Sequence, residues 1–135
     1  DFVIKRADGV YAYQLAVVVD DIAMGITEVV RGDDLLTSTP RQIALYQGLG
    51  ATVPAFLHVP LMLGADGVRL AKRHGSITLA QLRDQGHSPE RIIGYLAHTL
   101  GLQDHDHPIT ARELVSHFSL DRLHHKPTLV TGPFA

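Results

Sequence analysis

The apolar residues of the first 35 positions form short, mostly β-branched runs. Residues 2–4 and 10–15 flank an Ala-Asp-Gly sequence, and Asp-Gly readily supplies the positive φ of a tight turn, so a hairpin is predicted. Residues 16–19 are apolar without alternation, which is typical of a strand buried on both faces. Residues 26–30 predict a further strand. The last two runs end in charged residues, and open α/β sheets bind ligands at the carboxyl ends of strands.

The next pattern predicts a helix that begins at Thr39. Thr39 and Gln42 match a Thr-x-x-Gln capping box, Pro40 suits the first helical turn, and Gly48 or Gly50 can end the helix. Residues 56–62 then predict a strand. Its proline at position 60 makes it an edge or irregular strand, because proline cannot donate to a ladder. Residues 63–67 are glycine-containing and predict a loop.

From Thr78 onward the pattern indicates short helices. Thr78 is expected to cap a helix over residues 79–85, and Ser88 to open a longer one that ends at Gly101. Thr110 and a glutamate three residues later form a capping box for a helix through residue 117. Residues 123–135 read as an extended tail. The predicted fold class is therefore α/β over residues 1–77, followed by a small helical region over residues 78–135.

Composition narrows the classes of protein. The 135 residues include no Cys, 12 Lys+Arg, 14 Asp+Glu and 9 His, with 45% hydrophobic and 19% charged residues. These values fit a folded domain and exclude disulfides and a cysteine zinc site. The net charge of −2 excludes a strongly basic nucleic-acid domain but permits a local basic patch. No apolar run is long enough for a membrane helix, so a cytoplasmic protein is expected. A start without Met and with a strand-like pattern suggests a piece of a longer chain.

A cationic loop over residues 67–76 is the most informative candidate for chemistry. Arg69, Lys72 and Arg73 fall within five residues, beside small residues that let backbone N–H groups approach a ligand. Such a loop suits a polyphosphate, whose leaving group it can stabilise. The alternative is a solvated basic turn. His58 and His74 flank this predicted site.

Tyr13 and Arg31 form a second candidate pair. If their strands are neighbours in the sheet, both side chains could face one crevice. An arginine matches a carboxylate bidentately, and a tyrosine hydroxyl can orient it. The alternative is a Tyr at the edge of the core and a surface Arg paired with Asp33 or Asp34.

Acidic and histidine pairs are candidates for binding a metal ion. Asp20 and Asp21 could hold Mg²⁺ or orient a substrate amine, but acids at the start of a loop more often cap the following turn. The pairs at residues 105 and 107 and at residues 124 and 125 lie in polar, proline-flanked loops, without Cys or a His-x-x-x-His pair. No native metal site is predicted from these pairs.

Three ordered blocks, at residues 13–21, 25–36 and 38–42, resemble the second half of the catalytic domain of class I glutamyl-tRNA synthetases. The Arg-Leu-Ala-Lys-Arg sequence at residues 69–73 resembles the second ATP-binding signature of that class, KMSKS in generic form. The resemblance covers nearly the whole chain. It implies the second half of a Rossmann-like domain over residues 1–77 and a stem-contact-like helical region over residues 78–135.

The resemblance also implies roles for individual residues. Tyr13 and Arg31 would bind glutamate, and Lys72 would be the catalytic contact to the ATP phosphates. Arg69 stands where the signature usually has Lys, and Ala71 where it usually has Ser. The glutamate α-carboxylate would attack the ATP α-phosphate to give glutamyl-adenylate and pyrophosphate. The ATP-binding residues would be Arg69, Leu70, Ala71, Lys72 and Arg73.

Within this family the chain most resembles the subfamily of glutamyl-Q tRNA(Asp) synthetases, because residues 118–123 and the short tail resemble that subfamily's C-terminus. Such enzymes attach glutamate to the queuosine base of tRNA(Asp). The alternatives are the same region of an enzyme that charges tRNA(Glu), and a non-catalytic nucleotide- or RNA-binding half domain.

The resemblance further implies ATP with Mg²⁺ as cofactor and a monomeric full-length enzyme. Zinc and the HIGH-type signature would belong to an amino-terminal half that is absent here. The chain by itself is therefore expected to lack a complete adenylation site.

Overall fold

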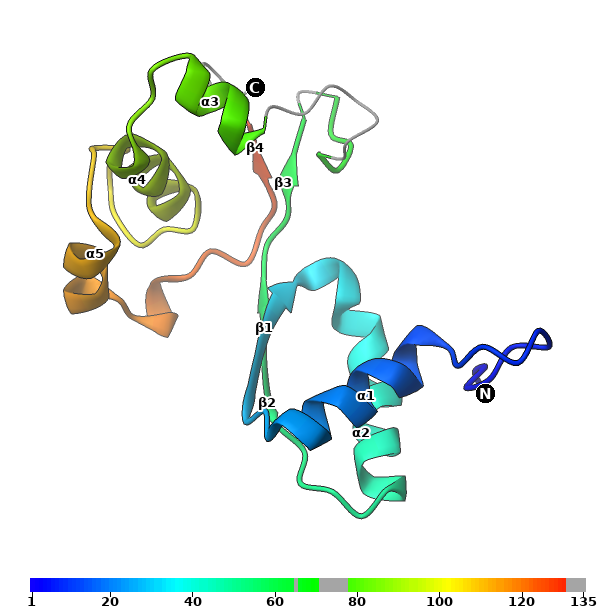
Figure 1. Cartoon of the computed structure of the whole chain (residues 1–135). Helices are drawn as coiled ribbons and strands as arrows, with labels where there is room; N and C mark the ends of the chain where they lie inside the picture. The colour runs from blue at the N-terminus through cyan, green and yellow to red at the C-terminus, as the bar shows by residue number, and fades with distance from the viewer. Residues whose placement is uncertain (65, 71–77, 131–135) are drawn as a thin grey trace. The chain divides into compact units, whose positions relative to one another are not determined.

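The computed structural model describes residues 1–64, 66–70 and 78–130 (Figure 1). It divides into two compact units, Asp1–His58 and Val59–Ala135. No helix in the described parts of the chain is long and apolar enough to cross a membrane.

The first unit opens with the predicted hairpin, although it is very short. Lys5 and Tyr11 form an isolated antiparallel bridge around Gly9, whose φ of 87° is the positive value that the turn requires. The amide of Ala12 donates to the carbonyl of Ile4 at 3.0 Å. The hairpin then ends, because the next residue starts a helix.

Helix α1 (Tyr13–Met24) occupies the segment for which the sequence predicted a buried strand. That prediction was wrong. The partly or fully buried positions of α1 are 14, 15, 17, 18 and 21, which is a helical spacing. Gly25 ends the helix in the left-handed region at φ 66°, and the amide of Ile26 reaches back to the Asp21 carbonyl. The preference of β-branched residues for strands is weak, so the packing of this face and the glycine cap override it.

Strands β1 (Glu28–Gly32) and β2 (Ala55–Val59) are hydrogen-bonded neighbours. The 3₁₀ helix η1 (Asp33–Ser38) and helix α2 (Thr39–Gly48) connect them. The predicted capping box at Thr39 is absent, because Ser38 occupies the N-cap and makes no side-chain cap bond. Pro40 does stand in the first turn, as predicted.

Helices α1 and α2 pack against each other in this unit. Val18 of α1 and Tyr46 of α2 are each 1% exposed. The Tyr46 hydroxyl donates to Asp21 Oδ2 at 3.1 Å, which links the two helices.

The second unit contains a parallel pair of short strands, β3 (Met62–Leu63) and β4 (Thr128–Leu129), with Met62 opposite Thr128. The predicted strand over residues 56–62 is thus interrupted at Pro60, as expected for an irregular strand. The tail contributes β4, so the region after residue 77 is not wholly helical. A small core lies beside this pair, formed by Leu82, Tyr95 and Val130 with Met62, Leu70 and Ile92 packed against it.

Three helices of the second unit begin at the predicted residues. Helix α3 (Leu79–Asp84) has a complete capping box from Thr78, and helix α5 (Ala111–His117) has one from Thr110. Helix α4 (Pro89–Thr99) is capped by the Ser88 hydroxyl. A short 3₁₀ helix, η3 (Leu120–Arg122), follows α5.

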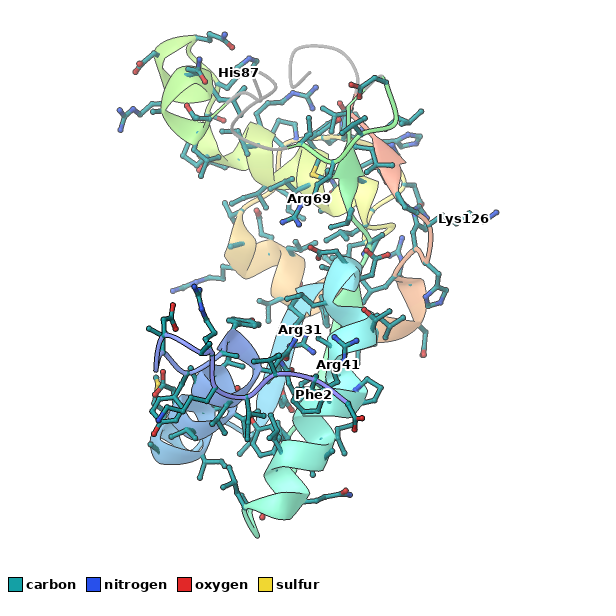
Figure 2. The ribbon with its side chains drawn as sticks, turned by 90° about the vertical axis from the view of Figure 1, so that its right-hand side faces the viewer. Phe2, Arg31, Arg41, Arg69, His87 and Lys126 are labelled. Atoms are coloured by element: carbon teal, nitrogen blue, oxygen red, sulfur yellow. The ribbon has the colours of Figure 1, made fainter. Side chains whose placement is uncertain are left out.

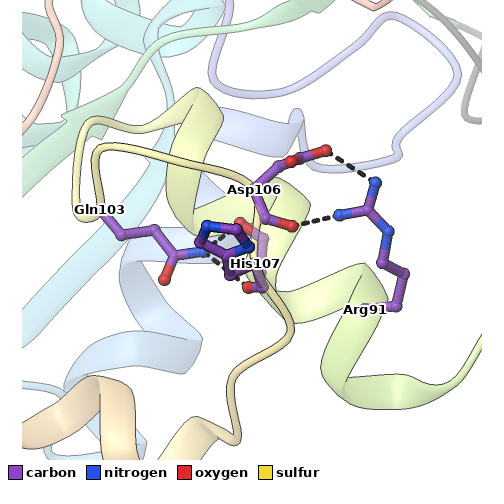
Figure 3. A network of polar contacts seen from close by, with 5 residues as sticks. Arg91, Gln103, Asp106 and His107 are labelled. Atoms are coloured by element: carbon purple, nitrogen blue, oxygen red, sulfur yellow. Dashed lines mark hydrogen bonds and ion pairs between the residues drawn. The ribbon is translucent and has the colours of Figure 1, made fainter.

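The loop after α4 is held against that helix by side chains (Figure 3). Arg91 forms an ion pair with Asp106 at 2.7 Å and also donates to the Asp106 carbonyl. The Gln103 amide donates to the carbonyls of Gly94 and His107, both at 2.9 Å. Gly94 allows this close approach, because a Cβ at that position would overlap the His107 carbonyl.

Candidate functional site

Arg31 is the centre of a polar network in the first unit, and its side chain extends from β1 toward α2 (Figure 2). Its Nη1 donates to Gln42 Oε1 at 2.6 Å, and its Nη2 donates to Thr39 Oγ1 at 2.8 Å and more weakly to the Leu35 carbonyl at 3.5 Å. Its Nε donates to His58 Nε2 at 3.3 Å. These bonds orient the guanidinium from three elements: η1, α2 and β2.

A second layer of side chains holds the groups that contact Arg31. Gln42 is 2% exposed, and its amide nitrogen donates to Gln14 Oε1 at 2.8 Å. Gln14 on α1 in turn donates to Ser38 Oγ at 3.0 Å. The network therefore ties α1 and α2 to Arg31 on the strand pair.

The electrostatics of this network favour an anionic ligand. All the bonded acceptors are uncharged: an amide oxygen, a hydroxyl, a carbonyl and an imidazole nitrogen. The Arg31 guanidinium also lies 5.0 Å from the centroid of the Phe56 ring, a cation–π contact that orients the charge without neutralising it. The positive charge therefore stays available for a carboxylate or phosphate.

The alternative in which Arg31 pairs with Asp33 or Asp34 is not what the structure shows. Both acids begin η1, and the four groups that accept hydrogen bonds from Arg31 do not include either carboxylate. The acidic pair at residues 20 and 21 neither ends a strand nor caps a turn, because it lies inside α1.

Tyr13 does not occupy the predicted place at the start of a strand. It is the first residue of α1, and it is 56% exposed. The groups that bond directly to Arg31 do not include it, whereas the adjacent Gln14 joins the network through Gln42. A direct role for Tyr13 therefore stays a prediction.

Tyr46 is a further buried residue of α2, and its ionisation depends on its burial and on its hydrogen bond to Asp21. Burial of the phenol, and then its hydrogen bond to the Asp21 carboxylate, raise the pKa of Tyr46 to about 12. The nearby charge of Arg31 opposes that rise. Tyr46 is thus a neutral donor that keeps α1 and α2 together, not an acid or base near neutral pH.

The cationic loop is described only at its beginning. Arg69 forms an antiparallel bridge with Leu63, and the Leu70 amide donates to the Met62 carbonyl at 3.3 Å. Leu70 packs against the core of the second unit, so the start of the loop is anchored there. Ala71, Lys72, Arg73 and His74 lie outside the described residues.

Among the described residues, no group of three or more His, Cys, Asp or Glu side chains could hold a metal ion. The rings of His105 and His107 lie 5.6 Å apart in an edge-to-face arrangement. In the loop after α4, His107 contributes its carbonyl to Gln103.

Sequence reasoning missed Gln14, Thr39 and Gln42 as site residues. The spacing of Thr39 and Gln42 suggested a helix cap, which needs the same residue types. Their burial, at 9% and 2% exposed, distinguishes the two roles, because a cap on a surface helix has no reason to be enclosed. The sequence places His58 beside the predicted phosphate loop, but in the structure its side chain accepts a hydrogen bond from Arg31.

Comparison with known proteins places the chain in a family. The family model for the catalytic domain of class I tRNA synthetases (E and Q) matches residues 1–131. The chain is 58% identical to the glutamyl-Q tRNA(Asp) synthetase of Symbiobacterium thermophilum and 55% identical to that of Nitratidesulfovibrio vulgaris, and it covers 40% of each. Those matches take in 96% and 97% of this chain. It is 52% identical to glutamate–tRNA ligase 1 of Alkalilimnicola ehrlichii over 93% of this chain and 26% of that protein.

A solved structure supports the same assignment. The crystal structure of a glutamate tRNA ligase from Elizabethkingia meningosepticum, in complex with its amino acid, superposes with a TM-score of 0.76 at 26% identity. The match covers 95% of this chain and 29% of that one. The α/β fold of this chain is that of a class I catalytic domain. The chain therefore belongs to the catalytic domain of the class I tRNA synthetases (E and Q).

Proposed function

We propose that the protein containing this chain is a glutamyl-Q tRNA(Asp) synthetase, which activates glutamate with ATP and transfers it to the queuosine base of tRNA(Asp). The observation that carries the glutamate assignment is the Arg31 guanidinium, which is held by four uncharged acceptors. A fixed cation whose acceptors among the described residues are all uncharged is suited to recognise a carboxylate substrate.

Glutamate has two carboxylates, and the proposed reaction uses one of them as nucleophile. The α-carboxylate oxygen forms a bond to the ATP α-phosphorus while the bond from that phosphorus to the bridging oxygen breaks, which releases pyrophosphate. Arg31 suits the side-chain carboxylate, because the attacking group has to remain free. Tyr13 is proposed as a second glutamate contact on the family resemblance.

ATP, with Mg²⁺, is proposed to bind at the cationic loop, residues 67–76, which follows β3. Leu70 anchors the start of the loop in the core of the second unit, and Lys72 is proposed to contact the phosphates. A fixed cation stabilises the charge that develops on departing pyrophosphate, and no protein nucleophile is needed. The remaining proposed contacts are Arg69, Ala71 and Arg73.

The choice of tRNA(Asp) is supported by the names of similar proteins. Two relatives at 58% and 55% identity are glutamyl-Q tRNA(Asp) synthetases, whereas a glutamate–tRNA ligase is 52% identical. The chain spans about 40% of the length of those first two relatives, so the proposed activity is assayed with the complete gene product.

The glutamate site is tested by glutamate-dependent ATP–pyrophosphate exchange with an Arg31→Ala variant. Loss of a charge-assisted contact worth about 1.5–3 kcal/mol raises the KM for glutamate by about 10- to 140-fold, with little change in the KM for ATP. Arg41→Ala is the matched control, because Arg41 is an exposed arginine on α2. An unchanged glutamate KM in Arg31→Ala contradicts the assignment.

The RNA substrate is tested by transfer of radiolabelled glutamate to purified tRNAs. We expect labelling of tRNA(Asp) that carries queuosine, and none of the same tRNA without queuosine. Labelling of tRNA(Glu) instead identifies a glutamate–tRNA ligase. Absence of pyrophosphate exchange with glutamate, both with and without tRNA present, contradicts the proposed catalytic activity.

A further inference from the structure

His58 is held in one position in the Arg31 network by contacts on several sides. Its Nε2 lies 3.3 Å from Arg31 Nε and 3.0 Å from Thr39 Oγ1. Its ring stacks on Phe56, with centroids 6.4 Å apart and planes at 12°. Phe56 also contacts the Arg31 guanidinium, so one aromatic side chain supports both partners of the hydrogen bond.

The chemistry of the partners determines the protonation of His58. A guanidinium has only donors, so the His58 Nε2 that faces Arg31 has to present a lone pair. The ring proton therefore resides on Nδ1, and the imidazole is neutral. The Thr39 oxygen accepts from Arg31 Nη2 at 2.8 Å, and its own proton is directed to the Leu35 carbonyl, which leaves the single lone pair of His58 Nε2 to Arg31.

We infer that neutral His58 is a positioning residue for glutamate, and that it acts by fixing the Arg31 guanidinium. The inference rests on the proposed role of Arg31 in glutamate binding. Recognition of a carboxylate by two parallel N–H groups depends on the plane of the guanidinium. Gln42 and Thr39 restrain the two terminal nitrogens, and His58 restrains Nε, so together they define that plane.

Protonation of His58 opposes this role. It replaces the lone pair at Nε2 with a donor and places a second positive charge beside Arg31. The charged group that contacts His58 is Arg31, which lies on β1. Helix α2 contributes two neutral side chains to the network, Thr39 and Gln42. The Asp21 carboxylate of α1 is bonded to Tyr46. No carboxylate of the described residues forms an ion pair with either ring nitrogen of His58, so none compensates the added charge.

The test compares two variants of the complete gene product in glutamate-dependent pyrophosphate exchange. His58→Ala removes the acceptor and is expected to raise the KM for glutamate by about 10-fold, with kcat and the KM for ATP nearly unchanged. His58→Gln offers an amide oxygen to Arg31 that cannot be protonated, and it is expected to restore most of the affinity. His125→Ala, at an exposed histidine, is the control for a general effect of histidine loss.

The pH profile separates positioning from a purely structural role. A protonated imidazole can only donate at Nε2, so the wild-type glutamate KM should rise as the pH is lowered. The rise should be smaller in His58→Gln. An unchanged KM in a folded His58→Ala, or the same acid-side rise in His58→Gln, overturns the inference.

A measurement on the unmutated enzyme keeps the test independent of folding. The ¹⁵N resonances of labelled histidine distinguish a protonated ring nitrogen from a bare one, and His58→Gln identifies the signal. We expect a bare Nε2 at the pH of the exchange assay, and a proton on Nε2 there overturns the inference. If the enzyme shows no exchange with glutamate, the proposed function fails, while this measurement still decides the state of His58.

Discussion

Substitution of Gly94 by alanine tests how the second unit holds its loop against α4. The added Cβ would overlap the His107 carbonyl oxygen and lie 2.8 Å from its carbonyl carbon and 3.3 Å from Gln103 Nε2. Two of these three atoms belong to the backbone, so a change of rotamer cannot relieve the overlap. The loop has to move away from the helix.

The expected magnitude combines opposing terms. Alanine favours a helix over glycine by about 1 kcal/mol. Against this, overpacking costs about 1–3 kcal/mol, and displacement of the loop weakens the two Gln103 bonds, each worth about 1 kcal/mol. The Arg91–Asp106 pair is partly exposed and adds little. We expect Gly94→Ala to lower the local stability by about 2 kcal/mol.

Hydrogen exchange in the complete gene product measures this loss where it occurs. A change of about 2 kcal/mol corresponds to roughly 30-fold faster exchange of the α4 amides. Gly48→Ala is the matched control, since a Cβ at the end of α2 meets nothing within 4 Å. Exchange in α4 that is unchanged or slower in Gly94→Ala refutes the reasoning.

Two further predictions concern Lys72 and Tyr46. Lys72→Ala is expected to lower kcat for pyrophosphate exchange by about 100-fold while changing the glutamate KM little, and kinetics that match the wild type would remove Lys72 from the site. Tyr46→Phe is expected to lower the free energy of unfolding by about 1 kcal/mol at neutral pH, because the bond to Asp21 is lost. Since the folded-state pKa of Tyr46 is raised from 10.0 to about 12, its neutral form contributes stability below pH 10 that disappears as the pH rises through 12. Between pH 10 and 12 the free energy of unfolding, measured from denaturation curves, should change less with pH in Tyr46→Phe than in the wild type.

Local signals in the sequence predicted the helices of the second unit well. Thr78, Ser88 and Thr110 each cap the helix they were expected to cap. A cap joins a side chain to a backbone amide three residues away, so its partners are fixed by the sequence itself. The ordered blocks similarly sufficed to predict the family that the comparisons confirm.

The first unit shows where such signals fail. Residues 16–19 have the composition of a strand but lie in α1, because the cap at Gly25 and the packing of Val18 outweigh a weak local preference. Thr39 and Gln42 have the spacing of a capping box, yet their side chains bind Arg31, which lies 8 and 11 residues away in the chain. A partly buried guanidinium requires acceptors more strongly than an exposed helix end does, because water can satisfy the helix end.

The sequence by itself determined the short-range features of this protein: its turns, the capped helices of the second unit, and the motifs that identify the family. Those motifs also indicate Arg31 as a candidate glutamate-binding residue. Only the tertiary structure decided what surrounds Arg31. Gln42 and His58 lie 11 and 27 residues beyond it, and Gln14 joins Gln42 across 28 residues. Periodicity and spacing carry no information over such separations, since those contacts exist only after α1, α2 and the strands have packed.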